Sequence, residues 1–159
     1  MNPNEQLIHQ FYTAFENKDY KTMQDCYADK ATFTDPVFTN LNALEVRAMW
    51  EMFCVKSKDL KIEFTNITAN ESEGSAEWTA NYTFSSTGKP VKNHIMARFG
   101  FENGKIAKHT DSFNFYNWAR QALGLPGVLL GWLPFLKSKV QKTGSLSLNQ
   151  YIERRNKLN

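Results

Sequence analysis

The sequence predicts a single α+β domain in which helices come first and a meander of long strands follows. Helix-like periodicity dominates the first third of the chain, and near residue 59 the period of the apolar residues switches from 3.6 to 2. Gly, Asn and Pro in the intervening turns are typical of hairpins. This order is typical of folds that place helices on one face of a sheet. At 159 residues, the chain is long enough for one domain with a sizeable core.

Three helices are expected before the strands. The first helix is expected over residues 3–17, whose apolar residues recur at helical spacing, and Pro3 suits its first turn. Residues 19–28 predict a second, short helix with Asp19 as its N-cap. Residues 42–55, "NALEVRAMWEMFCV", predict the third helix.

A short strand and four long ones are expected next. The stretch 31–38, "ATFTDPVF", separates the second and third helices and carries Asp35 in its middle. Because Asp-Pro often starts a turn, Asp35 has two interpretations: a turn former, or an acid at the wall of a pocket. The long strands are residues 59–71, 74–86, 89–102 and 105–118.

The C-terminal segment has a different character. Residues 122–136 are strongly apolar but interrupted by Gly and Pro, and they are shorter than the ~20 residues of a membrane span. Residues 145–158 predict an amphipathic helix. We therefore divide the chain into a domain, residues 1–118, and a C-terminal extension, residues 119–159, that packs on it.

Composition restricts the classes of partner. The net charge is only +3, and no Lys/Arg stripe interleaved with aromatic residues appears, which argues against nucleic acid. The histidines lack metal-ligand spacing, so no metal site is expected. Cys26 and Cys54 follow no secretory signal, which favours reduced thiols in the cytoplasm. The aromatic share of 14% suits a cavity lined with rings.

The stretch "YADKATFTDPV" and the "HTD" of the last strand resemble the nuclear transport factor 2-like superfamily. Within it, the ketosteroid isomerase and SnoaL-like polyketide cyclase branch is most similar, and the resemblance covers roughly residues 5–118. It implies a cone-shaped, strongly curved antiparallel sheet packed against three N-terminal helices and enclosing a pocket. It also implies a homodimer that needs no cofactor and takes a small hydrophobic ligand or substrate.

The resemblance assigns a proton-shuttling base to Asp35, but the isomerase oxyanion hole does not carry over. Its two donor positions are occupied here by Phe11 and Ala97, while the adjacent Tyr12 is rotated by about 100° around the helix. Each missing donor costs roughly 3–4 kcal/mol of transition-state stabilisation. A steroid isomerase is therefore disfavoured.

The last strand supplies a second set of candidate residues. Period-2 alternation puts His109, Asp111 and Phe113 on one face. "HTD" resembles the motif of SnoaL-like cyclases, in which the aspartate is a general acid/base for an aldol-type ring closure. The resemblance turns this face into the cavity, whose expected lining is Phe11, Phe15, Trp50, Phe53, Trp78, Tyr82, Asn93, Ala97, Phe99 and Phe113.

Two functions follow from these residues. The first is a cofactor-independent enzyme that isomerises, cyclises or hydrates a small hydrophobic compound, with Asp111 and Asp35 as acid and base and His109 orienting or sharing the proton. A carboxyl in an aromatic box has a raised pKa, as such chemistry near neutral pH requires. The second is a non-catalytic binding protein, in which Asp111 is a buried structural acid. Residues 122–136 would be a lid, a contact with a partner subunit, or a membrane-surface contact.

Overall fold

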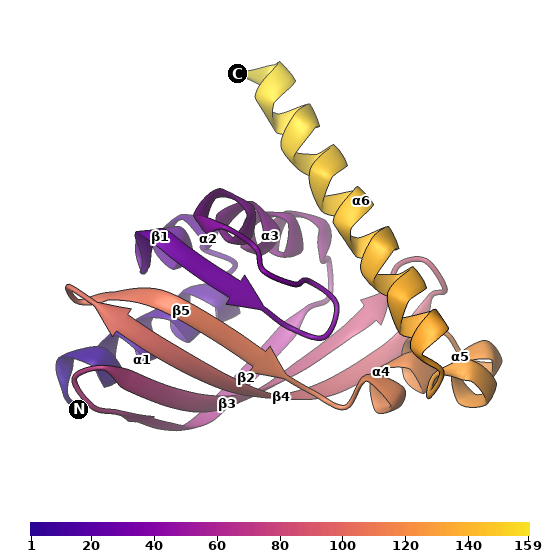
Figure 1. Cartoon of the computed structure of the whole chain (residues 1–159), viewed down its shortest axis with the longest axis horizontal. Helices are drawn as coiled ribbons and strands as arrows, with labels where there is room; N and C mark the ends of the chain where they lie inside the picture. The colour runs from indigo at the N-terminus through magenta and orange to yellow at the C-terminus, as the bar shows by residue number, and fades with distance from the viewer.

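The computed structural model describes all 159 residues and confirms the α+β class (Figure 1). Three helices and a short strand precede the meander, and three further helices follow it. The elements are α1 (Pro3–Glu16), α2 (Tyr20–Asp25), β1 (Tyr27–Thr34), α3 (Ala43–Lys56), β2 (Lys61–Ala69), β3 (Glu73–Phe84), β4 (Lys89–Glu102), β5 (Lys105–Ser112), α4 (Phe115–Ala122), α5 (Leu125–Leu130) and α6 (Pro134–Leu158).

The two long N-terminal helices start at asparagine capping boxes. The side chain of Asn2 accepts a hydrogen bond from the backbone N–H of Glu5, and the Glu5 carboxylate accepts one from the Asn2 N–H. Asn42 and Glu45 repeat this arrangement at the start of α3. Reciprocal capping satisfies backbone donors that the first turn leaves free, so both helix starts are fixed locally.

The five strands form one curled sheet in the order β1-β5-β4-β3-β2. Strands β2 to β5 pair antiparallel along the meander, whereas β1 joins the free edge of β5 in parallel. The register places Trp78 opposite Ile95 and Asp111 opposite Ala97, and all four side chains are buried on the same face. This inner face meets α1, α3 and α4, whereas the side chains of β4 that point to the opposite, outer face are mostly exposed.

The core fills the space between the helices and the inner face of the sheet. It is one cluster of 28 buried residues, rich in aromatic rings that contact edge to face, such as Phe15 against Trp50 and Trp78. A second, smaller cluster lies at the end of the sheet, where Trp118 and Ala119 of α4 cover Val91 of β4. Helix α4 thus closes one end of the curled sheet.

Several predicted boundaries are wrong. The first strand starts at Tyr27 and ends at Thr34, so Asp35 lies in the following turn and not within a strand. The last strand ends at Ser112, because the Asn114 side chain caps the backbone N–H of Asn117 and starts α4, so residues 115–118 are helical. The amphipathic C-terminal helix begins at Pro134 and not near residue 145.

Helix α6 runs diagonally past α3 and past the turn that carries Asp35 (Figure 1). Arg155 pairs with Glu51 of α3 at 2.5 Å, and Gln141 Nε2 donates to the Pro36 carbonyl at 3.0 Å. Leu148 is buried against the main core. No helix is both long and apolar enough to cross a membrane.

Candidate functional site

Three polar residues are buried in the fold, and two of them lie two positions apart on β5. His109 and Asp111 are 1% and 4% exposed, and Asn93 of β4 is the third. His109 stands opposite Phe99 in the ladder and Asp111 opposite Ala97. Both side chains therefore point from the inner face of the sheet into the aromatic core.

A chain of hydrogen bonds crosses the core and ends on Asp111. Trp50 Nε1 donates to the Tyr27 hydroxyl at 2.8 Å, and this hydroxyl lies 2.7 Å from His109 Nδ1. On the other side of the ring, His109 Nε2 lies 3.0 Å from Asp111 Oδ1. The chain thus links α3, β1 and β5 through three bonds.

The donors in this chain have one consistent direction. An indole N–H can only donate, so the Tyr27 oxygen accepts from Trp50 and its own proton is left to donate to His109 Nδ1. A neutral His109 then carries its proton on Nε2 and donates it to Asp111. The Asp111 carboxylate is therefore the terminal acceptor of the chain.

Aromatic rings hold the His109 imidazole from several sides. The ring centroids of Phe99 and Phe33 lie 4.4 and 5.0 Å from that of His109, and Trp50 stacks on it at 6.0 Å. Phe11 adds an edge contact at 5.7 Å. Because these neighbours are themselves buried, the orientation of the imidazole is fixed by packing as well as by hydrogen bonds.

Two buried donors near this chain make no hydrogen bond within the protein. They are the Tyr12 hydroxyl and Trp78 Nε1. Burial raises the pKa of Tyr12 well above its ordinary value, and the nearby charge of Asp111 raises it further. Tyr12 therefore stays protonated, and it offers an unused O–H within electrostatic reach of the Asp111 carboxylate. An unpaired buried donor costs free energy that an oxygen atom of a ligand would recover.

Asp35 is both a turn former and a perturbed acid. Its Oδ1 accepts the backbone N–H groups of Val37 at 2.7 Å and Phe38 at 2.6 Å, as in an Asx turn. Its Oδ2 makes no hydrogen bond within the protein. Desolvation raises the pKa of Asp35 to about 7, although the two backbone bonds lower it, and the charge of Asp111 adds a smaller increase. Asp35 can thus exchange a proton near neutral pH.

A second indole–tyrosine pair lies near Asp35. Trp118 Nε1 of α4 donates to the Tyr82 hydroxyl of β3 at 2.8 Å, which leaves the Tyr82 proton free for another acceptor. Burial raises the pKa of Tyr82, and the charge of Asp35 contributes to the increase. At the end of the sheet that α4 covers, the Tyr82 phenol and the Asp35 carboxyl therefore lie close enough for the charge of one to affect the pKa of the other.

The residues expected to line a cavity fall into two groups. Phe11, Phe15, Trp50, Trp78, Asn93, Ala97 and Phe99 are buried, whereas Phe53, Tyr82 and Phe113 are half-buried. Apart from Asn93, they belong to the main core cluster or pack against it. Two hollows lie elsewhere, one of about 280 Å³ beside α1 and α2 and one of about 400 Å³ between α4 and the start of α6.

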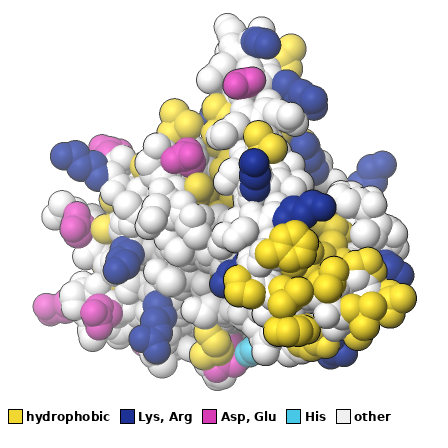
Figure 2. All heavy atoms as spheres, turned by 45° about the vertical axis from the view of Figure 1, so that its right-hand side comes forward, with side chains coloured by type: hydrophobic (Ala, Val, Ile, Leu, Met, Phe, Trp, Pro, Cys, Tyr) yellow, Lys and Arg dark blue, Asp and Glu magenta, His cyan; other side chains and the backbone are white.

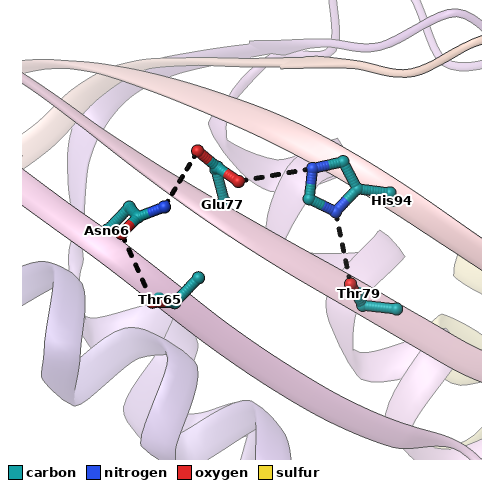
Figure 3. Close-up of polar contacts among 5 residues, drawn as sticks. All are labelled: Thr65, Asn66, Glu77, Thr79 and His94. Carbon is teal, nitrogen blue, oxygen red and sulfur yellow. Dashed lines mark hydrogen bonds and ion pairs between the residues drawn. The ribbon is translucent and has the colours of Figure 1, made fainter.

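The other histidines lie away from this interior. Figure 3 shows His94 on the outer face of the sheet, where Nε2 lies 3.4 Å from Glu77 Oε2 and Nδ1 lies 3.3 Å from Thr79 Oγ1. Asn66 donates to the other oxygen of Glu77 at 3.0 Å. No three His, Cys, Asp or Glu side chains gather into a metal-binding cluster.

Sequence reasoning missed two residues of the site, Tyr27 and Tyr12. Tyr27 fell at the end of the helix expected over residues 19–28, whereas α2 ends at Asp25 and Tyr27 begins β1. Tyr12 was expected to rotate away from the interior, yet both Phe11 and Tyr12 are fully buried. The signal available for Tyr12 was the width of the apolar stripe on α1, since a helix enclosed by a curled sheet buries more than one row of side chains.

Comparison with known proteins gives a family match. The SnoaL-like domain model matches residues 8–109, which is more than half of the chain. Among proteins with curated descriptions, none matches this sequence.

Solved structures share the fold at low sequence identity. An LEH-like epoxide hydrolase of M. tuberculosis is 16% identical, with 84% of this chain and 98% of that chain covered and a TM-score of 0.62. IdmH of Streptomyces antibioticus, a proposed polyketide cyclase, is 18% identical with 79% and 100% covered and a TM-score of 0.64. An NTF2-like protein of unknown function from Burkholderia pseudomallei is 18% identical, with 76% and 98% covered and a TM-score of 0.67.

Proposed function

The chain belongs to the SnoaL-like domain family, and from this premise we propose that it is a cofactor-independent general acid/base enzyme acting on a small hydrophobic molecule. The observation that carries the proposal is the hydrogen-bond chain from Trp50 through Tyr27 and His109 to Asp111. Such a chain orients one carboxylate in an apolar interior, where a positioned base is effective. The similarity to cyclases and an epoxide hydrolase supports the general class.

We assign the two acids different roles, and the assignment reverses the role of base that the resemblance gives to Asp35. Asp111 is the base, because it accepts the bond from His109 and has a second oxygen for the proton of a substrate C–H or of a water molecule. Asp35, whose pKa is about 7, is the acid that protonates the oxygen on which charge develops. Two carboxyls whose surroundings differ in this way divide acid and base work between them. His109 is a positioning residue, since it acts through Asp111.

The unpaired donors supply the remaining polar contacts. The Tyr12 hydroxyl and Trp78 Nε1 would hold an oxygen of the substrate, which removes the cost of burying them unsatisfied. Isomerisation, cyclisation and the addition of water all need one proton removed and one delivered. A ketone, enone or epoxide offers the acceptor oxygen that these donors require. Because Asp35 is only partly buried, it can take up a proton from solvent between turnovers.

The same donors also favour a second candidate function, a non-catalytic binding protein for a small oxygen-bearing apolar molecule. A ligand oxygen on Tyr12 and Trp78 would satisfy both donors without any proton transfer. In this alternative Asp111 only terminates the hydrogen-bond chain. A cytoplasmic location and a homodimer belong to the proposal as well; the two free, buried cysteines are consistent with a reducing compartment.

Substitution of Asp111 by Asn separates the two functions. Small ketones, enones and epoxides are screened for turnover, and wild type is compared with Asp111→Asn, which keeps the shape but removes the base. The enzyme proposal expects kcat to fall by about 10²–10⁴-fold. Asp29→Asn on the exposed side of β1 is the matched control and should retain wild-type kcat. A variant within about threefold of wild type excludes Asp111 as the base; equal ligand affinity with no turnover supports the binding protein.

A further inference from the structure

Helix α5, the turn after it and the start of α6 expose a group of large apolar side chains. Figure 2 shows them as a continuous yellow area at the lower right of that view. Trp132 is the most exposed at 70%. We call this surface the α5 patch; it consists of Leu125, Val128, Leu129, Leu130, Trp132 and Phe135. A contiguous apolar area of this kind marks a contact surface.

The backbone packing of α5 makes this exposure a fixed feature of the fold. Gly127 is buried against the backbone of α4 at Ala119 and Arg120, so closely that a Cβ atom would overlap the Ala119 carbonyl. Because the glycine side of α5 faces α4, the larger residues on either side of Gly127 turn outward. The α5 patch is therefore directed to solvent by a tight helix contact and is not a loosely packed part of the core.

Basic side chains surround the α5 patch, and acidic ones are absent from this part of the chain. Lys89 lies against Gly124 at the start of α5, and Lys137 lies 6.0 Å from the ring centroid of Phe115. Between Asp111 and Glu153 there are four basic residues, Arg120, Lys137, Lys139 and Lys142, and no Asp or Glu. Figure 2 shows dark blue side chains around the yellow area.

We propose that the α5 patch docks on the surface of an anionic lipid bilayer. Apolar side chains would enter the boundary between headgroups and acyl chains, while the basic side chains would meet lipid phosphates. The hollow of about 400 Å³ beside the patch is bordered by Phe115, Trp132 and Lys137, which combines apolar walls with an ammonium group. A phosphate attached to an acyl chain matches that combination.

Charge complementarity favours a bilayer over a second copy of this chain. In a twofold dimer built on the α5 patch, each rim would face an identical rim. Arg120 and Lys137 of one copy would then face an equally basic rim, with no carboxylate from residues 112–152 to compensate them. An anionic lipid surface compensates every one of these charges. The inference is independent of the chemistry proposed for Asp111.

Binding of the full-length protein to vesicles tests the proposal. Phosphatidylcholine vesicles with about 30% phosphatidylglycerol should bind at least about tenfold more tightly than phosphatidylcholine alone, and salt should weaken the binding. Trp132 reports the contact by itself, because the other tryptophans are buried, and its emission should shift to shorter wavelength on binding. Absence of binding to the anionic vesicles overturns the proposal.

Two variants and two matched controls locate the contact. Trp132→Ser and Lys137→Glu should each weaken vesicle binding at least about fivefold, since one removes an inserting ring and the other inverts a rim charge. Met96→Ser and Lys108→Glu make the same kinds of change on the outer face of the sheet and should bind like wild type. Equal binding by all four variants overturns the proposal. Sedimentation velocity measures the alternative. If wild type does not bind vesicles and Trp132→Ser converts a dimer to a monomer, the α5 patch is an interface with a second copy of this chain and not a lipid-docking surface.

Discussion

Replacement of Tyr27 by Phe removes one hydroxyl from the middle of the buried hydrogen-bond chain and leaves the ring in place. The hydroxyl accepts from Trp50 Nε1 at 2.8 Å and lies 2.7 Å from His109 Nδ1, so its loss leaves one buried donor and one buried acceptor unpaired. Each unpaired buried group costs about 1–3 kcal/mol, which sums to about 2–6 kcal/mol. That is a large part of the 5–15 kcal/mol typical of a whole domain.

Urea denaturation followed by circular dichroism measures this loss. With a slope of about 2 kcal/mol/M, a loss of about 4 kcal/mol moves the midpoint down by about 2 M. Tyr12→Phe is the matched control, because it removes an equally buried hydroxyl that makes no bond. We expect the control to change the free energy of unfolding by less than about 1 kcal/mol, or to raise it. Equal losses in the free energy of unfolding for Tyr27→Phe and Tyr12→Phe would refute the hydrogen bonds that the structure gives to the Tyr27 hydroxyl.

Three further predictions concern the turn after β1 and the C-terminal helices. The native pKa of Asp35, about 7, exceeds the pKa of Asp in an unfolded chain, so the contribution of Asp35 to stability is full below pH 4 and falls by at most about 4 kcal/mol as the pH rises past 7. Asp35→Asn should remove this pH dependence when urea titrations are repeated across the pH range. An unchanged pH profile contradicts the raised pKa of Asp35. Gly127→Ala should lower thermal stability by about 1–3 kcal/mol by pushing α5 off α4, and a neutral result would contradict that contact. Asn114→Ala should cost about 1 kcal/mol in the same melts through loss of the α4 cap, whereas an effect below about 0.3 kcal/mol would mean that the cap is dispensable.

The fold class was predictable because its signals are local and repeated. The alternation in β3 and β4 extends over many residues, so the faces of Trp78 and Ala97 could be read without knowledge of their partners. The parallel addition of β1 to β5 was not predictable in this way. It depends on two edges far apart in the sequence, and the pairing register shifts between Tyr27 and Thr32.

The candidate site was partly predictable for the same reason. His109 and Asp111 follow the alternation of β5, and their burial agrees with the face expected for them. Asp35 was placed in a strand because Val37 and Phe38 continue an apolar pattern, whereas its side chain bonds to their backbone N–H groups and forms a turn. The hydroxyl of Tyr27 became relevant only through contacts with α3 and β5, which no local pattern contains.

The parallel pairing of β1 with β5 has a consequence for the order of folding. The Tyr27–His109 hydrogen bond joins residues 82 positions apart, whereas the meander from β2 to β5 closes through short hairpins. Distant contacts form after nearby ones, because the chain entropy of the large loop must be lost first. We therefore expect the hairpins to assemble early and the hydrogen-bond chain to form only when β1 docks. A partly folded molecule would then contain most of the sheet and none of the site, so activity would report the completed fold.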